Sequence, residues 1–243
     1  HLTVAQMLIG NGLTFLFVVA AVLVVDIPSA RHRGEEGWRQ LTIGLRLAKA
    51  RPPLRRLLLT MFLFSFLALP FVGLFPTVAE MGFGLHPRSA SYSWLLATFG
   101  AGALVGSLSV GSVFAHIDRR RLIPPAFVGF AAMLFTFGML RSPVPAYPVG
   151  FVLGAFYFCV TTAISTEFQT RMEHSERVFL MALWFMAFGG TVPLGNLVFG
   201  PLLDHVGPRW VLGIGAVVAL SLARWCNLVR LEQRAATPLR STT

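Results

Sequence analysis

The stretch SYSWLLATFGAGALVGSLSVGSVFA, residues 91–115, is followed immediately by HIDRRR, residues 116–121. The first segment contains no charged side chain, and it exceeds the about 20 apolar residues that a helix needs to cross the bilayer core. The second segment ends in consecutive arginines, which favour cytoplasmic loops because they are costly to translocate. Together the two segments predict a membrane-spanning helix whose C-terminal end lies at the cytoplasmic face.

Apolar stretches of this length recur along the chain. Their approximate bounds are Val4–Ile27, Leu57–Val78, Ser91–Ala115, Leu122–Leu140, Pro148–Thr166, Val178–Gly200 and Trp210–Val229. The mean hydropathy is +0.70, and only 12% of the residues are charged, whereas a soluble domain usually carries about 25%. We therefore predict an all-α, polytopic membrane protein with about seven transmembrane helices.

Positive charge is distributed unevenly between the two sides of these stretches. All but three of the 20 Arg and Lys residues fall in alternate connections, the exceptions being Arg88, Arg141 and Arg209. The positive-inside rule places the C-terminus in the cytoplasm and the N-terminus outside, in a cell membrane that the chain crosses several times. Topology thus explains the net charge of +10, so we expect the lipid bilayer as a partner and no nucleic acid.

The one long connection, Pro28–Leu54, contains a second kind of helical pattern. Its apolar residues Trp38, Leu41, Leu45 and Ala48 recur at helical spacing, with basic residues elsewhere around the helix. This pattern predicts an amphipathic helix that lies on the inner membrane surface.

Glycine, proline and polar residues interrupt several of the apolar stretches. The GxxxG spacing of Gly102 and Gly106 predicts a close approach to another helix. Proline and glycine within a membrane helix permit kinks. The hinge candidates are Pro70, Gly73, Gly189, Gly190 and Pro193.

Polar and aromatic residues inside the stretches are the candidates for contact with a transported molecule. They are Asn11, Thr161, Thr191, Asn196, Phe156, Tyr157 and Trp184. Each has a structural alternative, because hydroxyls bond back to helix carbonyls, amides join helices and aromatic rings pack.

No group of residues points to an enzyme. Cys159 and Cys226 both lie inside apolar stretches, where we interpret them as small buried residues. The six histidines are scattered and show no ligand spacing. We expect no catalytic residue, no metal and no cofactor. The single lysine, Lys49, lies in a loop, which argues against a retinal protein.

Two boundaries between stretches resemble each other. Gly111 and Gly200 each begin a Gly-x-x-x-x-His segment that continues to an arginine. The two segments are three stretches apart and lie on opposite membrane faces, as in an inverted three-helix repeat.

On these residues the chain resembles the C-terminal half of a major facilitator superfamily transporter, and most of all the bacterial transmembrane secretion effectors, which include siderophore and macrolide exporters. The segments that carry the resemblance are Gln169–Val178, Pro193–Gly195 and Gly200–Arg209. It implies an incomplete major facilitator fold. Residues 1–27 would be helix 6, 28–56 the central cytoplasmic loop, 57–230 the C-terminal six-helix bundle and 231–243 a cytoplasmic tail.

The resemblance further implies proton-coupled efflux of a small molecule by an antiporter that works by alternating access. The cytoplasmic gating loop would comprise Gly111, Asp118, Arg119, Arg120 and Arg121, although the acidic position of the family motif falls on Ala115. The missing N-terminal half and a small-molecule substrate would be the partners. We expect this half to be unstable or inactive alone.

Glu167 is the candidate proton-coupling residue of this half, and its alternative role is an interfacial acid that pairs with Arg171. A seven-helix receptor, or a vestigial membrane protein that does not transport, is the alternative to the transporter.

Overall fold

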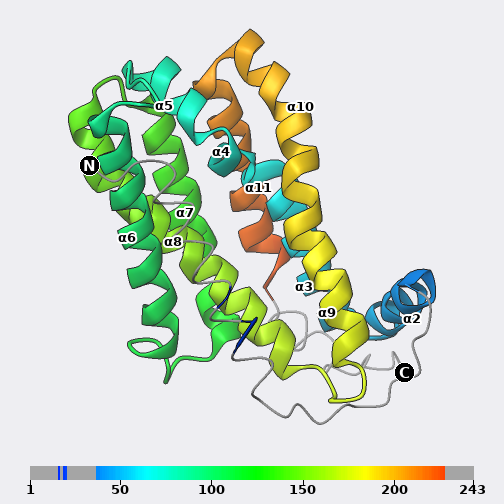
Figure 1. Ribbon diagram of the computed structural model, residues 1–243. Helices are drawn as coiled ribbons and strands as arrows, with labels where there is room; N and C mark the ends of the chain where they lie inside the picture. The colour runs from blue at the N-terminus through cyan, green and yellow to red at the C-terminus, as the bar shows by residue number, and fades with distance from the viewer. Residues whose placement is uncertain (1–15, 17–18, 21–36, 228–243) are drawn as a thin grey trace, which may run out of the picture. The chain divides into compact units, whose positions relative to one another are not determined.

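The computed structural model describes residue 16, residues 19–20 and residues 37–227, without the side chains of residues 37, 38 and 40. Every regular element of this part of the chain is helical (Figure 1). The chain divides into two compact units, residues 1–37 and 38–243, and we call the second of them the helical unit. Most of the predicted stretch Val4–Ile27, including Asn11, lies outside the described residues.

The helices follow one another in chain order. They are α2 (Gly37–Ala50), α3 (Pro52–Leu63), the π-helix η1 (Phe64–Ala68), α4 (Pro70–Gly73), α5 (Phe75–Phe83), α6 (Ala90–Gly111), α7 (Arg119–Met139), α8 (Pro143–Thr170), α9 (Arg177–Phe185), the π-helix η2 (Met186–Gly190), α10 (Thr191–Val206) and α11 (Pro208–Trp225). The predicted all-α fold is confirmed.

Four helical stretches within the described residues are long and apolar enough to cross a membrane. They are α6, α7, α8 and the continuous run Arg177–Val206, which joins α9, η2 and α10. These match the third to sixth stretches predicted from the sequence. The second predicted stretch is broken into α3, η1, α4 and α5, and the seventh corresponds to α11. The total number of membrane crossings stays a prediction.

Proline explains the break after η1. Pro70 has no N–H group and begins α4, while the N–H of Leu69 donates to the carbonyl of Phe64 at 3.0 Å. This bond spans five residues instead of four, which is the π-helical pattern. The wider turn keeps the backbone groups before the proline paired, as a chain inside lipid requires.

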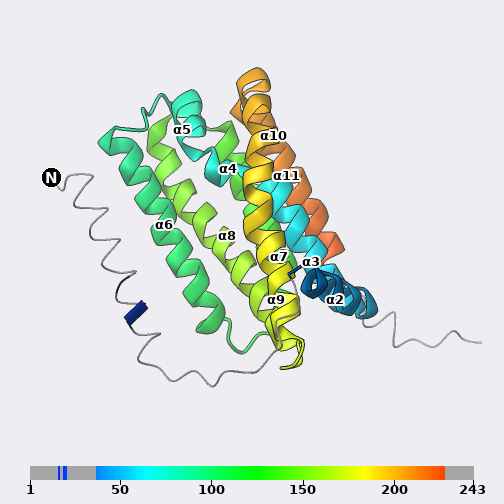
Figure 2. The ribbon, with the colours of Figure 1, turned by 45° about the vertical axis from the view of Figure 1, so that its right-hand side comes forward.

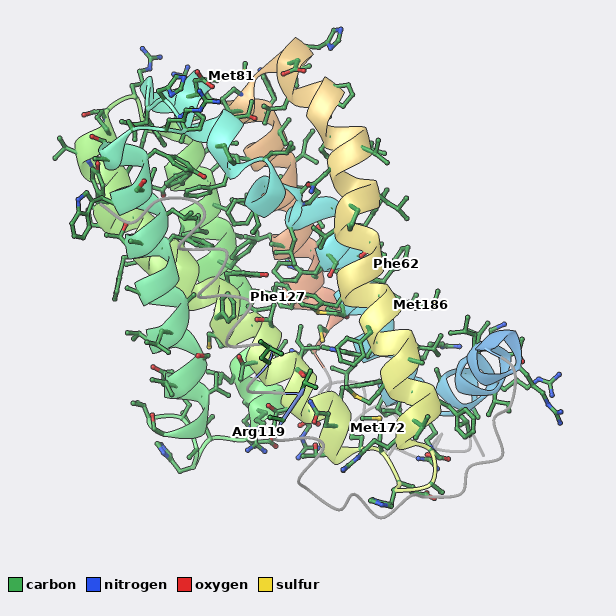
Figure 3. All side chains as sticks on the ribbon, in the orientation of Figure 1. Phe62, Met81, Arg119, Phe127, Met172 and Met186 are labelled. Atoms are coloured by element: carbon green, nitrogen blue, oxygen red, sulfur yellow. The ribbon has the colours of Figure 1, made fainter. Side chains whose placement is uncertain are left out.

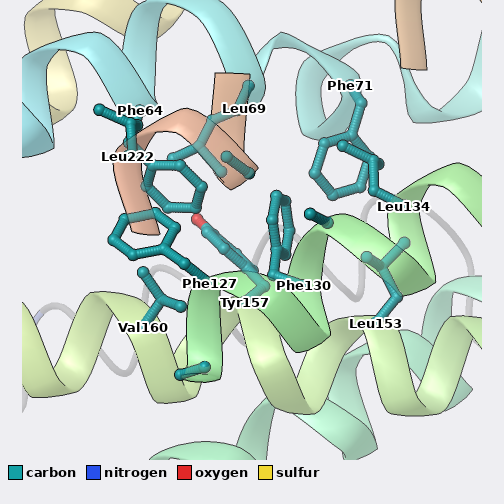
Figure 4. Packing of buried hydrophobic residues seen from close by; sticks show 14 of the residues in the cluster. Phe64, Leu69, Phe71, Phe127, Phe130, Leu134, Leu153, Tyr157, Val160 and Leu222 are labelled. Atoms are coloured by element: carbon teal, nitrogen blue, oxygen red, sulfur yellow. The ribbon is translucent and has the colours of Figure 1, made fainter. Parts of the chain in front are cut away.

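Aromatic rings fill the centre of the helical unit (Figure 4). The ring of Phe64 from η1 meets the rings of Phe127 and Phe130 from α7 edge to face, at centroid distances of 5.1 and 5.2 Å. The ring of Tyr157 from α8 lies 6.4 Å from that of Phe64. Edge-to-face contacts are a preferred arrangement of aromatic pairs; here they join η1 to α7, and the tilted ring of Tyr157 adds α8 to the cluster.

Glycine brings α6 and α8 into backbone contact. A Cβ atom added to Gly102 would overlap the carbonyl oxygen of Phe151, and one added to Gly106 would overlap that of Ala155. From the other side, a Cβ atom on Gly154 would overlap the carbonyl oxygen of Phe99. The close approach predicted from the GxxxG spacing is confirmed, and its partner is α8.

A second glycine crossing repeats the first at a constant interval. A Cβ atom on Gly195 of α10 would lie 2.7 Å from the carbonyl oxygen of Phe66 in η1. Gly195 follows Gly106 by 89 residues, and Ala155 follows Phe66 by the same 89. The resembling boundaries at Gly111 and Gly200 are also 89 residues apart. The paired crossings agree with the inverted three-helix repeat predicted from the sequence.

We expect Gly106→Leu to weaken the crossing of α6 and α8, because the new side chain must displace the Ala155 carbonyl. Overpacking of this kind typically costs about 1–3 kcal/mol. Gly100→Leu is the matched control, since nothing lies within 4 Å of a Cβ atom on Gly100. Thermal unfolding in detergent should show a lower midpoint for G106L than for G100L. Equal midpoints would contradict the role of this crossing.

Asp118 caps the N-terminus of α7, and we expect Asp118→Ala to destabilise the protein by about 1 kcal/mol. The carboxylate accepts from the Arg120 backbone N–H at 3.1 Å and from its guanidinium at 2.6 Å. Asp118→Asn is the control that keeps the cap and removes the ion pair. Equal unfolding midpoints of D118A and wild type at pH 7 would show that the cap contributes nothing.

The hydrogen bonds from Arg120 lower the pKa of Asp118 below its usual range, and this sets a pH dependence. A carboxyl group whose pKa is lower in the folded than in the unfolded state stabilises the fold at pH values above its unfolded-state pKa, about 4 for aspartate. This stabilisation is lost as the pH falls through the folded-state pKa. The midpoint difference between wild type and D118N should therefore be present at neutral pH and disappear in acid. A difference that does not change with pH would contradict this origin.

Candidate functional site

Four hydroxyl side chains line one side of a hollow beside the C-terminal half of α8. The hollow measures about 250 Å³. Its lining comes from α3, α8, α9 and η2, and comprises Met61, Phe158, Thr161, Thr162, Ser165, Thr166, Trp184 and Phe188. Two predicted pathway residues, Thr161 and Trp184, meet here although they lie on different helices. We call this space the hydroxyl hollow.

Two of the four hydroxyl groups, those of Thr161 and Thr166, already use their hydrogen atoms within α8. Thr161 donates to the carbonyls of Tyr157 at 3.1 Å and Phe158 at 3.2 Å, and Thr166 donates to that of Thr162 at 2.8 Å. A hydroxyl oxygen that donates in this way keeps lone pairs for accepting. The hollow therefore offers hydrogen-bond acceptors to a ligand.

The aromatic wall of the hydroxyl hollow is held by stacking. The indole of Trp184 is only 5% exposed and stacks on the ring of Phe168, with centroids 5.0 Å apart. The ring of Phe158 meets that of Tyr157 edge to face at 4.7 Å. Rings fixed in this way present stable apolar faces to a ligand.

Other predicted pathway residues lie away from this hollow. Tyr157 belongs to the aromatic core, and the ring of Phe156 fills the space beside Gly129 of α7. Thr191 donates to the Ala187 carbonyl at 2.7 Å and lines a neighbouring, almost wholly apolar hollow of about 410 Å³. Phe62 and Met186 also line that neighbouring hollow (Figure 3).

Asn196 of α10 lies against Gly73 of α4. A Cβ atom on Gly73 would overlap the Asn196 amide, and the amide oxygen is buried without a hydrogen-bond partner among the described residues. The amide lines neither hollow. It sits at the crossing of α4 and α10, and its contact with a transported molecule stays a prediction.

The hinge candidates flank the two π-helices. Pro70 follows η1, Gly189 and Gly190 end η2, and Pro193 lies in the first turn of α10. The segments η1 and η2 pack against each other, so the least regular parts of the two interrupted helices meet. That these residues act as hinges stays a prediction.

Charged side chains gather at the end of the unit where α8 ends and α9 begins. Glu167, one of the few buried polar residues, accepts from the Nε of Arg171 at 2.6 Å. The interfacial ion pair named as an alternative for Glu167 is therefore present. A role of Glu167 in proton coupling stays a prediction.

Sequence reasoning missed a second ion-pair cluster at this end. The guanidinium of Arg51 reaches Glu173 at 2.7 Å and Glu176 at 2.9 Å. The contact joins the start of α3 to the loop before α9. The only sequence signal is that both segments belong to the predicted cytoplasmic side, and nothing local pairs residues more than 120 positions apart.

The predicted gating loop connects α6 to α7. Gly111 ends α6 in open space, and Asp118 is paired with Arg120 of its own helix turn. Figure 3 shows Arg119 at the same end as Met172, opposite to Met81. Asp118 therefore has a local partner, whereas a lock between helices through this loop stays a prediction. No cluster of metal-binding side chains occurs within the described residues.

Comparison with known proteins adds one finding. The family model described as transmembrane secretion effector, MFS_3, matches residues 4–242. No curated protein and no solved structure gives a significant match. The family match does not favour the seven-helix receptor or the vestigial protein, and it points away from an enzyme. Nearly the whole chain is covered, so together with its apolar helices the match shows that this chain belongs to the transmembrane secretion effectors, a family of major facilitator transporters.

Proposed function

We propose that this chain forms the C-terminal bundle of a proton-coupled exporter that expels small organic molecules from the cytoplasm by alternating access. One observation carries the proposal. The hydroxyl hollow is lined by Met61, Trp184 and Phe188, which lie within or next to the two interrupted helices whose π-helical segments pack together. A ligand in the hollow would thus contact the parts of the unit that bend most easily.

The exposure of the helices supports a partner bundle. Each of these helices contains an apolar segment of 18 residues that could cross the membrane. Half of that segment is buried in α7 and in α8, but only 33% of it in α6 and 22% in Arg177–Val206. In Figure 1 α6 and α10 lie at opposite sides of the helical unit, and in the turned view of Figure 2 α10 lies between α8 and α11. The exposed residues of α6 include Ser93, Ala97 and Ala101, four positions apart, beside larger apolar ones such as Leu104 and Leu108, and small residues at this spacing suit close helix packing. An N-terminal six-helix bundle would cover this face.

The lining of the hydroxyl hollow suggests a class of substrate. It contains hydroxyl oxygens and aromatic faces and no charged side chain. Such a site suits an organic molecule that brings its own hydrogen-bond donors and an apolar body. This supports placing the protein among the siderophore and macrolide exporters of the family.

Glu167 and Arg171 are a candidate for the proton-coupled step. The Glu167 carboxylate is buried and has Arg171 as its ion-pair partner. Protonation would cancel one charge of this pair and leave the arginine to seek another partner. A buried pair that switches in this way links proton binding to a change of structure.

Thr161→Val is expected to weaken substrate binding, because it replaces an acceptor in the hydroxyl hollow with a methyl group of similar size. Loss of one hydrogen bond costs about 1 kcal/mol, so KM for efflux should rise about fivefold. Thr136→Val in α7 is the matched control, since Thr136 bonds back to Ala132 at 2.8 Å and lines neither hollow. Efflux of a panel of macrolides and siderophores from cells that produce the protein is the measurement.

Equal KM values for T161V and T136V would exclude Thr161 from the substrate site. Absence of energy-dependent efflux for every compound in the panel, at normal protein levels, would contradict the assignment to this subgroup.

Glu167→Gln is expected to uncouple transport from the proton gradient, because an amide cannot bind and release a proton. Substrate exchange without a gradient should continue in reconstituted vesicles, while accumulation driven by a pH gradient should fall at least about tenfold. Glu173→Gln is the control, since its carboxylate lies at the same end and is 67% exposed. Full gradient-driven accumulation by E167Q would show that Glu167 is only a structural partner of Arg171.

A further inference from the structure

A large hollow lies between α7 and α11, away from the hydroxyl hollow. It measures about 700 Å³ and is almost wholly apolar. Its walls are Phe135 and Met139 of α7 on one side and Trp210, Ile214 and Val217 of α11 on the other. A cavity of this size falls in the range of small-molecule sites, about 300–1,000 Å³.

Glycine leaves room on the floor of this hollow. Gly213 lies on α11 between the wall residues, and nothing occurs within 4 Å of a Cβ atom added to it. Next to the hollow the two helices approach closely, because a Cβ atom on Gly138 would lie 3.1 Å from the Cβ of Leu212. Close contact at one point and open space beside it produce a groove along α11.

A smaller, more polar hollow of about 310 Å³ adjoins the groove at the N-terminal end of α11. Both are lined by Arg209 and Trp210. An apolar groove therefore continues, past one arginine and one tryptophan, into a polar space at the end of the helices. The charge distribution predicts that this end faces the outside.

Arg209 is free to bind an anion. It is exposed, and no acidic side chain in the described residues pairs with it. Glu80 and Asp204 belong to the same end but line neither hollow. No side chain caps α11, so its first-turn N–H groups, which have no acceptor within the helix, add to the positive potential.

We propose that this composite groove is a binding site for an anionic phospholipid. The phosphate binds the guanidinium of Arg209 in the polar hollow, because guanidinium and phosphate match in charge and in bidentate geometry. One acyl chain lies in the apolar groove over Gly213. Trp210 occupies the boundary between them, at the membrane depth where tryptophan is enriched. The proposal does not depend on the transported substrate.

The test measures binding of a short-chain phosphatidylglycerol to the full-length protein in mild detergent, by native mass spectrometry, with phosphatidylcholine of the same chain length as reference. We expect phosphatidylglycerol to bind about tenfold more tightly, which corresponds to one charge-assisted contact. Arg209→Gln should abolish this preference. Arg141→Gln should preserve it, since Arg141 is exposed at the same end and lines neither hollow.

A second variant tests the groove itself. Gly213→Leu fills the space for the acyl chain without touching the arginine, so it should weaken both lipids, whereas Gly100→Leu on the exposed face of α6 should weaken neither. The proposal is overturned if wild type binds the two lipids equally, or if R209Q retains the preference. It is also overturned if G213L changes only self-association of the protein, because the groove would then hold a second copy of the chain.

Discussion

Backbone contact between α6 and α8 is the constraint on which the rest of this structure depends. Lipid tails are as apolar as leucine, so helices in a membrane gain little from hiding apolar side chains from the solvent. They associate where their atoms meet closely. Gly102, Gly106 and Gly154 remove the side chains that would keep these two helices apart. The crossing places α8 along the middle of the unit, where its aromatic residues reach α7 and η1.

The second consequence of lipid as a solvent is that every break in a helix must still pair its backbone groups. The structure meets this demand with π-helical turns before Pro70 and before Thr191. These turns lie against each other, beside the hydroxyl hollow. The same constraint that makes the breaks costly therefore concentrates them in one place, where a transporter needs a deformable region next to its ligand.

The candidate site was only partly predictable from the sequence. Thr161 and Trp184 were both named and do share a hollow, but Tyr157 and Phe156 were named on the same grounds and pack elsewhere. The residue type says only that a side chain is polar or aromatic. Whether that side chain faces a hollow or the core depends on how its helix is rotated against the neighbouring helices. The contacts of Arg51 with Glu173 and Glu176 were not predictable for a related reason, because the partners belong to segments far apart along the chain.

By itself the sequence determined the helical class, the approximate bounds of the apolar helices, the expected side of each connection and the places where helices break. All of these depend on local composition, charge and the missing N–H of proline, which act on a segment wherever it lies. Only the tertiary structure decided which glycine meets which carbonyl, which hydroxyls face a hollow and where a lone arginine adjoins an apolar groove. A helix leaves its rotation and its partners open until it packs, and each of these features is made by two or more helices at once.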